Sequence, residues 1–139
     1  MCNNKNLDHG PNPCVINVEE TAKQNMNFRT AIWTGCHLQM TVMCISECSD
    51  IGLEIHEDTD QIIRVEEGMA CVEMGCNRNR LGHQYNLCVG DVVFVPAGTW
   101  HNIINTGNCA LKLSTVYAPP HHPAGTVHRT KEDAQRAYE

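Results

Sequence analysis

The segment from Gly90 to Asn105 constrains the fold of this chain more than any other. It holds a short apolar run over residues 92–95, a corner formed by Pro96-Ala-Gly98, and a second strand-like run that begins beside His101. Apolar runs of this length and composition, bounded by turn residues, are typical of strands. Proline and glycine at this spacing turn the backbone sharply. We therefore expect His101 just past a tight corner, with its imidazole directed into a barrel.

The fixed residues of this segment resemble the second conserved motif of the cupin superfamily. Their order is Gly, five residues, Pro, one residue, Gly, two residues, His, three residues and Asn. Residues 52–68 resemble the first motif in a modified form, with Glu54 and His56 in the places of two histidines and Gln61 in the place of a glutamate. The resemblance implies an all-β fold: a double-stranded β-helix, that is, a jelly-roll or cupin barrel.

The resemblance also implies a divalent transition metal bound by Glu54, His56, Gln61 and His101. Side chains alternate along a strand, so residues 54 and 56 share one face. The set keeps one carboxylate, as in the family pattern, but its extra oxygen ligands make the site harder. Manganese, iron(II), cobalt and nickel are favoured, and zinc stays open. Two alternatives stay open. In one, Gln61 orients His56 without binding the ion. In the other, His56, Asp58 and His101 form a triad, although Asp58 lies in a polar turn.

Many short apolar runs separated by polar turns indicate one all-β domain. We expect an N-terminal arm over 1–27 with a helical turn, a barrel over 28–118, and a Pro/His-rich tail over 119–139. The sequence from Thr130 to Asp133 resembles a capping box, which predicts a short helix through Tyr138. The expected strands cover residues 28–34, 36–45, 53–56, 61–67, 69–75, 84–89, 91–95, 100–105 and 110–118.

The barrel wall near the expected metal is predicted to be apolar. Alternation from Gln61 directs Ile63 and Val65 inward and Arg64 outward. A sugar phosphate would require convergent basic groups, and Arg29, like Lys112, is interpreted as an isolated, solvated charge. The sequence therefore predicts no dedicated phosphate site.

Two further stretches are informative: Asn102-Ile-Ile-Asn-Thr-Gly and the later Tyr117-Ala-Pro-Pro-His-His-Pro-Ala-Gly-Thr-Val-His128. With them, the chain between residues 28 and 135 is similar to small cupins of the mannose-6-phosphate isomerase-like group. This likeness implies a metal-dependent enzyme acting on a small oxygenated molecule, as a sugar isomerase or epimerase does. A non-catalytic cupin that binds a small ligand or metal, and an iron or nickel oxygenase, are the alternatives. Isomerisation needs a general base, and the candidates are Glu73, His83 and Tyr117, none of which the spacing singles out.

Composition narrows the partners and the compartment. The net charge is −6 without a basic cluster, which argues against nucleic acid and anionic membrane surfaces as partners. The first residues lack the apolar core of a secretory signal, and no Cys-x2-Cys occurs among nine cysteines. We expect a cytoplasmic protein with reduced thiols, of which Cys44, Cys71 and Cys88 serve as small buried hydrophobes. We also expect a homodimer that pairs through residues 28–44.

The tail has a pattern of its own. Three prolines stiffen residues 118–125 into an extended segment with few backbone donors, so the tail should leave the barrel at one end. Its histidines are then either solvated, which is the favoured interpretation, or part of a lid over the pocket. The histidines in question are His121, His122 and His128.

Overall fold

The computed structural model describes residues 7–137 and consists mainly of short antiparallel strands. Two short helices lie near the ends of the described chain. The elements, in chain order, are α1 (Val18–Gln24), β1 (Arg29–Thr34), β2 (Gln39–Ile45), β3 (Asp60–Glu67), β4 (Ala70–Gly75), β5 (His83–Leu87), β6 (Val92–Val95), β7 (Trp100–Asn105), β8 (Leu111–Ala118), β9 (Val127–His128) and α2 (Lys131–Arg136).

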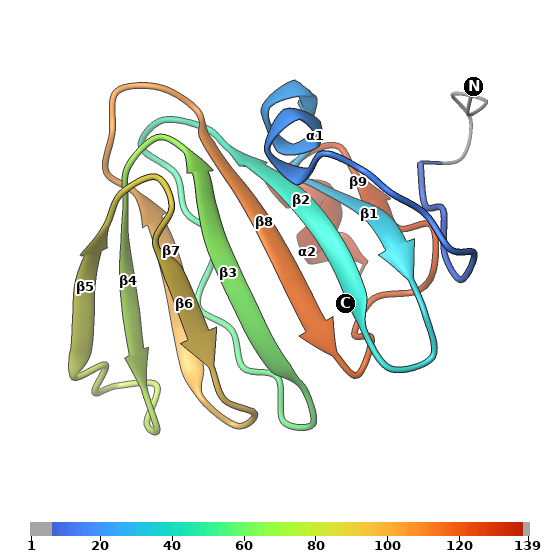
Figure 1. Ribbon diagram of the computed structural model, residues 1–139. Helices are drawn as coiled ribbons and strands as arrows, with labels where there is room; N and C mark the ends of the chain where they lie inside the picture. The colour runs from blue at the N-terminus through green and yellow to red at the C-terminus, as the bar shows by residue number, and fades with distance from the viewer. Residues whose placement is uncertain (1–6, 138–139) are drawn as a thin grey trace.

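The strands form two sheets that face each other across one core (Figure 1). The larger sheet has the order β6-β3-β8-β2-β1-β9, and the smaller has the order β5-β4-β7. The main core cluster draws side chains from both sheets, including Val65 and Leu113 from one and Val72 and Ile103 from the other. This arrangement confirms the expected all-β double-stranded β-helix with a short C-terminal helix.

Strand alternation decides which side chains reach the barrel interior. On β3, Gln61, Ile63 and Val65 are buried while Arg64 is exposed, as predicted. The pairing of β3 with β8 shifts register between Val65 and Glu67. This irregularity coincides with a further buried side chain, Glu66, whose Oε2 accepts a 2.6 Å hydrogen bond from Ser114.

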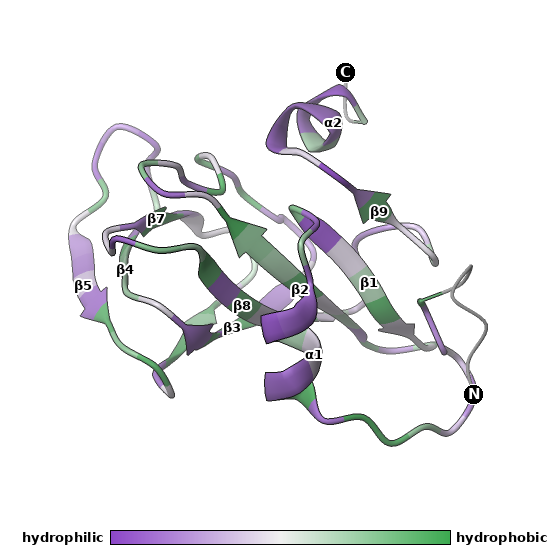
Figure 2. Cartoon of the chain, turned by 90° about the horizontal axis from the view of Figure 1, so that it is seen from above, coloured by the Kyte–Doolittle hydropathy of each residue, from purple (hydrophilic) through white to green (hydrophobic). Residues whose placement is uncertain are grey.

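The helices cover opposite sides of the larger sheet, and Figure 2 shows that both are mostly hydrophilic. Ala22 of α1 packs against Ile32 and Val42, whereas Ala134 of α2 joins the main core on the other side. Thr130 caps α2 by accepting a 3.1 Å hydrogen bond from the Asp133 N–H, so the predicted cap is confirmed. Tyr138, the predicted helix end, lies outside the described residues. Neither described helix has the length and apolar character needed to cross a membrane.

Two local predictions were wrong. Residues 53–56 form no strand; they are an extended segment with a single bridge between Glu54 and His101. Lys112 is buried rather than solvated, because its ammonium donates to the carbonyl of Asn25, the C-terminal cap of α1. A cation at this end also complements the helix dipole.

The cysteines within residues 7–137 are free thiols, and Cys2 lies outside that range. Cys44 and Cys71 are half-buried on β2 and β4. Cys88, by contrast, is exposed, because β5 ends at Leu87 and the chain turns there toward β6. The prediction of a buried thiol was therefore wrong for Cys88.

Candidate metal centre

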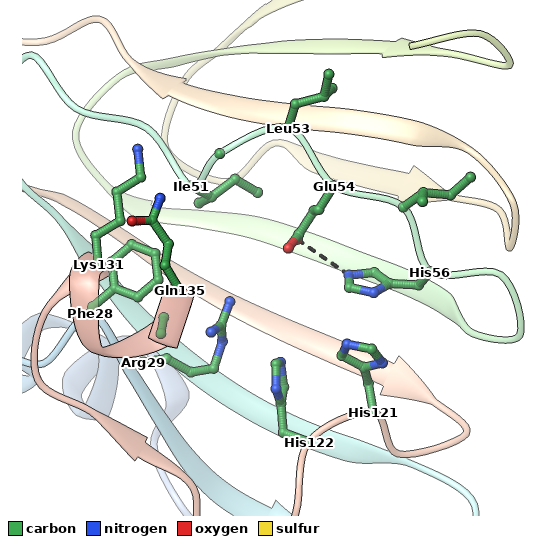
Figure 3. Close-up of a pocket in the computed structure, with 13 residues that line it drawn as sticks. Phe28, Arg29, Ile51, Leu53, Glu54, His56, His121, His122, Lys131 and Gln135 are labelled. Atoms are coloured by element: carbon green, nitrogen blue, oxygen red, sulfur yellow. Dashed lines mark hydrogen bonds and ion pairs between the residues drawn. The ribbon is translucent and has the colours of Figure 1, made fainter. Parts of the chain in front are cut away.

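A pocket of about 370 Å³ opens at one end of the barrel (Figure 3). One wall is the extended segment over 51–56, and the opposite wall comes from the start of β1, the tail and α2. The pocket is lined by both polar and apolar side chains. Its polar side chains include Arg29, Glu54, His56, His121 and His122.

Backbone pairing brings the two motif segments together at this pocket. The Glu54 N–H donates to the His101 carbonyl at 3.0 Å, and the His101 N–H donates back to Glu54 at 2.9 Å. The Gly98 N–H donates to the His56 carbonyl at 2.8 Å. Gly98 has a φ of +77°, a conformation that glycine adopts without steric cost. The Pro-x-Gly corner therefore fixes His56 beside His101 through the main chain.

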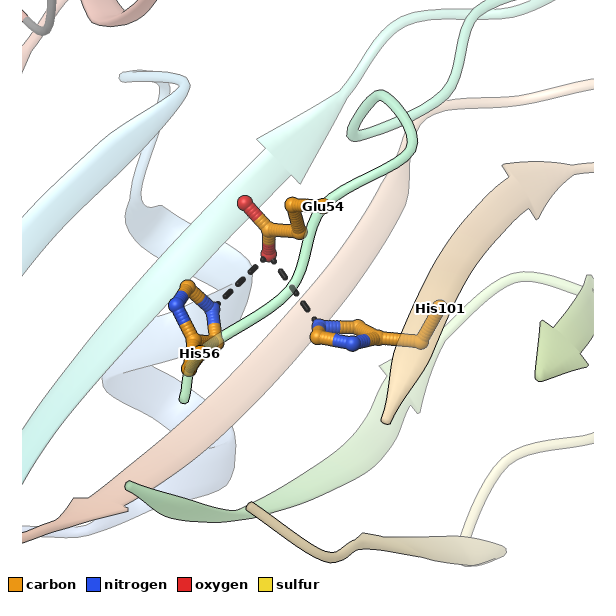
Figure 4. A group of neighbouring side chains, drawn as sticks. All are labelled: Glu54, His56 and His101. Atoms are coloured by element: carbon orange, nitrogen blue, oxygen red, sulfur yellow. Dashed lines mark hydrogen bonds and ion pairs between the residues drawn. The ribbon is translucent and has the colours of Figure 1, made fainter. Parts of the chain in front are cut away.

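Three of the predicted ligands converge on one point (Figure 4). Oε1 of Glu54 lies 3.3 Å from Nε2 of His56 and 3.3 Å from Nε2 of His101. Charge-assisted hydrogen bonds are usually shorter, at about 2.7–2.9 Å. Ligand atoms bonded to one ion at about 2.1 Å, with angles of about 90–110°, are separated by about 3.0–3.4 Å. The observed spacing therefore fits a shared divalent ion.

The tautomer of His101 also fits metal binding. Its Nδ1 lies 2.9 Å from the carbonyl oxygen of Thr99, which can only accept, so Nδ1 carries the proton. In its neutral form the ring then presents a lone pair at Nε2, an atom that is buried without an aligned hydrogen bond in a side chain that is 0% exposed. Metal-binding histidines are commonly oriented in this way, by a hydrogen bond from the ring nitrogen that does not bind the metal.

Glu54 supplies the negative charge of the group. Burial alone would raise the pKa of its carboxyl, but the imidazoles of His101 and His56 outweigh burial and lower that pKa well below its usual range. The carboxylate is therefore ionised at neutral pH. Its charge would offset half of the charge of a divalent ion.

Gln61 lies inside the barrel, as predicted. It pairs with Tyr117 on β8, and directly opposed residues in an antiparallel pair point to the same face. The Tyr117 ring in turn lies 5.7 Å from the His56 ring. The Gln61 Oε1 is buried without a hydrogen-bond partner, as a ligand oxygen awaiting an ion would be. Whether Gln61 binds the ion or orients His56 stays a prediction.

The alternative triad is not assembled. Asp58 lies in the exposed turn at 57–58. Among the described residues, Glu54, His56 and His101 form a group whose ligand atoms all lie within 4.8 Å of one another. Asp58 is not a member of it.

Of the candidate bases, one is near the metal group. Glu73 alternates with the buried Ala70 and Val72 on β4 and so faces away from the core, and His83 is exposed on β5. Tyr117 is fully buried beside His56, and burial raises the pKa of its hydroxyl above the usual value.

Sequence reasoning missed Arg29 and misplaced the tail. Arg29 was interpreted as solvated but is 3% exposed, and its Nη1 lies 3.1 Å from Nδ1 of His128. His122 and His128 are buried, so the solvated interpretation was wrong for both. His121 is exposed, yet its ring centroid lies only 4.1 Å from that of His56. Residues 29–32 of β1 are all buried, so the strand shows no alternation that could have indicated the direction of Arg29.

Comparison with known proteins agrees with this geometry. Residues 41–117 match the model of the cupin domain family. The uncharacterized protein YrkC of Bacillus subtilis is 53% identical over 130 residues, which cover 94% of this chain and 70% of that protein. The crystal structure of BH2720 from Bacillus halodurans superposes with a TM-score of 0.93 at 52% identity, covering 94% and 98% of the two chains. A Thermotoga maritima protein described as a predicted oxalate decarboxylase gives a TM-score of 0.53 at 26% identity, over 60% of this chain and 67% of its own.

Proposed function

The chain belongs to the cupin family, and we propose that it binds a divalent transition metal through Glu54, His56, Gln61 and His101 to act on a small oxygenated molecule. The observation that carries the proposal is the meeting of one carboxylate oxygen and two imidazole nitrogens at 3.3 Å spacing beside a pocket. Isomerisation or epimerisation of a sugar-like carbonyl compound is the reaction class that the motif resemblance favours. We also propose a cytoplasmic location, which the free thiols of the described residues support.

An ion held there would supply Lewis-acid polarisation of a carbonyl or hydroxyl oxygen. The chain's own side chains do the rest. The Glu54 carboxylate keeps the group from accumulating excess positive charge, and the apolar wall of the pocket, which includes Ile51 and Ile55, limits the approach of water. The exposed ring of His121, tilted at 58° to the ring of His56 with its centroid 4.1 Å away, lies where it can contact a molecule bound next to the ion.

A non-catalytic binding role is the second candidate. It is favoured by the positions of the sequence-derived bases: Glu73 and His83 lie away from the pocket, and the pKa of Tyr117 is raised by burial. A hydroxyl with a raised pKa keeps its proton at neutral pH and so is not available as a general base. Such a site would hold metal and ligand without turnover.

Elemental analysis of protein purified without added metal tests the metal assignment. About one ion per chain is expected for the wild type, and a near-complete loss for His101→Ala. His83→Ala, which removes an exposed histidine from β5, is the matched control and should keep the ion. Full occupancy in a folded His101→Ala variant would refute the assignment. Gln61→Leu separates the two interpretations of the amide: loss of metal identifies a ligand, and retention identifies an orienting residue.

Turnover separates the two candidate functions. The metal-loaded protein is incubated in deuterated water with a panel of sugars, sugar phosphates and oxo-acids, and NMR follows exchange of carbon-bound protons. Exchange that disappears in His101→Ala supports the enzyme. Binding of a panel member by the wild type without exchange supports the non-catalytic cupin.

A further inference from the structure

Arg29 is a buried cation without an anionic partner. No carboxylate of residues 7–137 lies within ion-pair distance of its guanidinium. Its Nε is buried without a hydrogen-bond acceptor, and Nη1 meets a neutral-acceptor position, Nδ1 of His128. Burial and the nearby guanidinium both lower the pKa of His128, so this ring does not compete as a cation.

A buried charge is costly unless it is paired, and arginine cannot escape the cost by losing its proton. Figure 3 shows the guanidinium directed into the pocket, with Phe28 on one side and His122 on the other. The other basic residue of the pocket, Lys131, is already paired with Asp50. The missing counter-charge therefore belongs to whatever occupies the pocket.

From this we infer that the pocket binds a small monoanionic carboxylate, with the carboxylate on Arg29 and the apolar part of the molecule against Phe28, Ile51 and Leu53. A planar guanidinium matches a carboxylate with two parallel hydrogen bonds. A phosphate dianion would call for more than one unpaired cation, and the pocket offers one. A volume of about 370 Å³ lies near the lower end for ligand sites, which restricts the ligand to a small molecule.

The inference rests on the proposed function, since it names the class of molecule that would lie beside the metal ligands. Arg29 and the metal group stand on opposite walls of the pocket, Arg29 on β1 and Glu54 on the 51–56 segment. A carboxylate held on Arg29 thus leaves the remainder of the molecule facing Glu54 and His56. The two interactions are separable, because Arg29 needs no metal to bind an anion.

The test uses benzoate and isovalerate, with benzamide and isovaleramide as uncharged matches, in calorimetric titrations of the metal-loaded and chelator-treated protein. We expect each acid to bind at least about tenfold more tightly than its amide in both forms. Arg29→Gln should abolish that preference. Lys131→Gln, the control at the pocket rim, should change it by less than about twofold.

A readout on the unmodified protein covers the case in which Arg29→Gln does not fold. The NMR signal of the Arg29 Nε–H group should shift on addition of benzoate and not of benzamide. Equal binding of acids and amides, no binding of either, an unmoved Nε–H signal, or a preference that survives in folded Arg29→Gln would each overturn the inference. If the protein binds metal but shows no preference for carboxylates, only this inference is refuted. If the protein prefers carboxylates but binds no metal, only the proposed function is refuted.

Discussion

Replacing Gln39 by leucine should detach the tail from the barrel. Gln39 is 0% exposed, and its amide ties the tail down through backbone atoms. Its Nε2 donates to the His122 carbonyl at 2.9 Å, and its Oε1 accepts from the N–H groups of His122 at 2.9 Å and His121 at 3.3 Å. Nε2 also donates to Thr34 at 3.0 Å. Leucine fills a similar volume but makes none of these bonds.

The size of the effect follows from these contacts. Three hydrogen bonds to the tail at about 1 kcal/mol each predict a loss of about 2–4 kcal/mol in the free energy of unfolding, including any polar group left buried and unpaired. For 139 residues, the entropy of unfolding is about 0.29 kcal/mol per kelvin. The melting temperature should therefore fall by about 7–14 °C.

Urea denaturation and calorimetry of chelator-treated protein measure the loss without interference from metal. Trypsin reports the detachment directly, since Arg129 lies exposed between β9 and α2 and should be cut faster in Gln39→Leu. Gln84→Leu, an exposed glutamine on β5, is the control and should behave as the wild type. A destabilisation under about 0.5 kcal/mol with unchanged cleavage would show that the amide does not hold the tail.

Two further predictions concern pH and assembly. Burial, and then the charge of Arg29, lower the pKa of His122 to about 2, whereas the unfolded chain takes up this proton near 6.5. The free energy of unfolding should therefore fall as pH drops below about 6.5, by up to about 1.4 kcal/mol per pH unit from this group. In urea titrations of metal-free protein, His122→Asn should flatten that slope. An identical slope in the variant would contradict the assignment. Light scattering at micromolar concentration should give about twice the 15.5 kDa chain mass. Leu38→Lys, which alters a 42%-exposed leucine before β2, should give a monomer. A monomeric wild type would reject the dimer.

The metal group could be predicted from the sequence because its geometry is set locally. His101 follows the Pro96–Gly98 corner directly, and Glu54 and His56 are two residues apart on an extended segment. The corner and the segment then pair through main-chain hydrogen bonds that depend little on distant residues. Residue spacing was enough to bring these three side chains together.

The opposite wall of the pocket could not be predicted in the same way. Arg29 is buried because β9, only two residues long, pairs with the start of β1, and this contact joins positions 99 residues apart. A two-residue strand leaves no alternation pattern. Both faces of β1 are also covered, by α1 on one side and the pocket on the other, so its burial runs BBBB over the first four residues. Because β1 has no polar face, the sequence pattern could not predict whether the Arg29 side chain points into the barrel or out of it.

The pocket is built from residues inside and outside the match to the cupin domain family. The cupin match spans residues 41–117 and includes all four expected ligands, whereas Arg29, the tail histidines and α2 lie outside it. The residues that would bind the ion therefore lie within the match, and the arginine that would bind the carboxylate lies outside it. Arg29→Gln should therefore change the ligand preference while leaving the ion in place. The charge of the bound molecule could then change through a residue outside the match, with the four metal ligands unaltered.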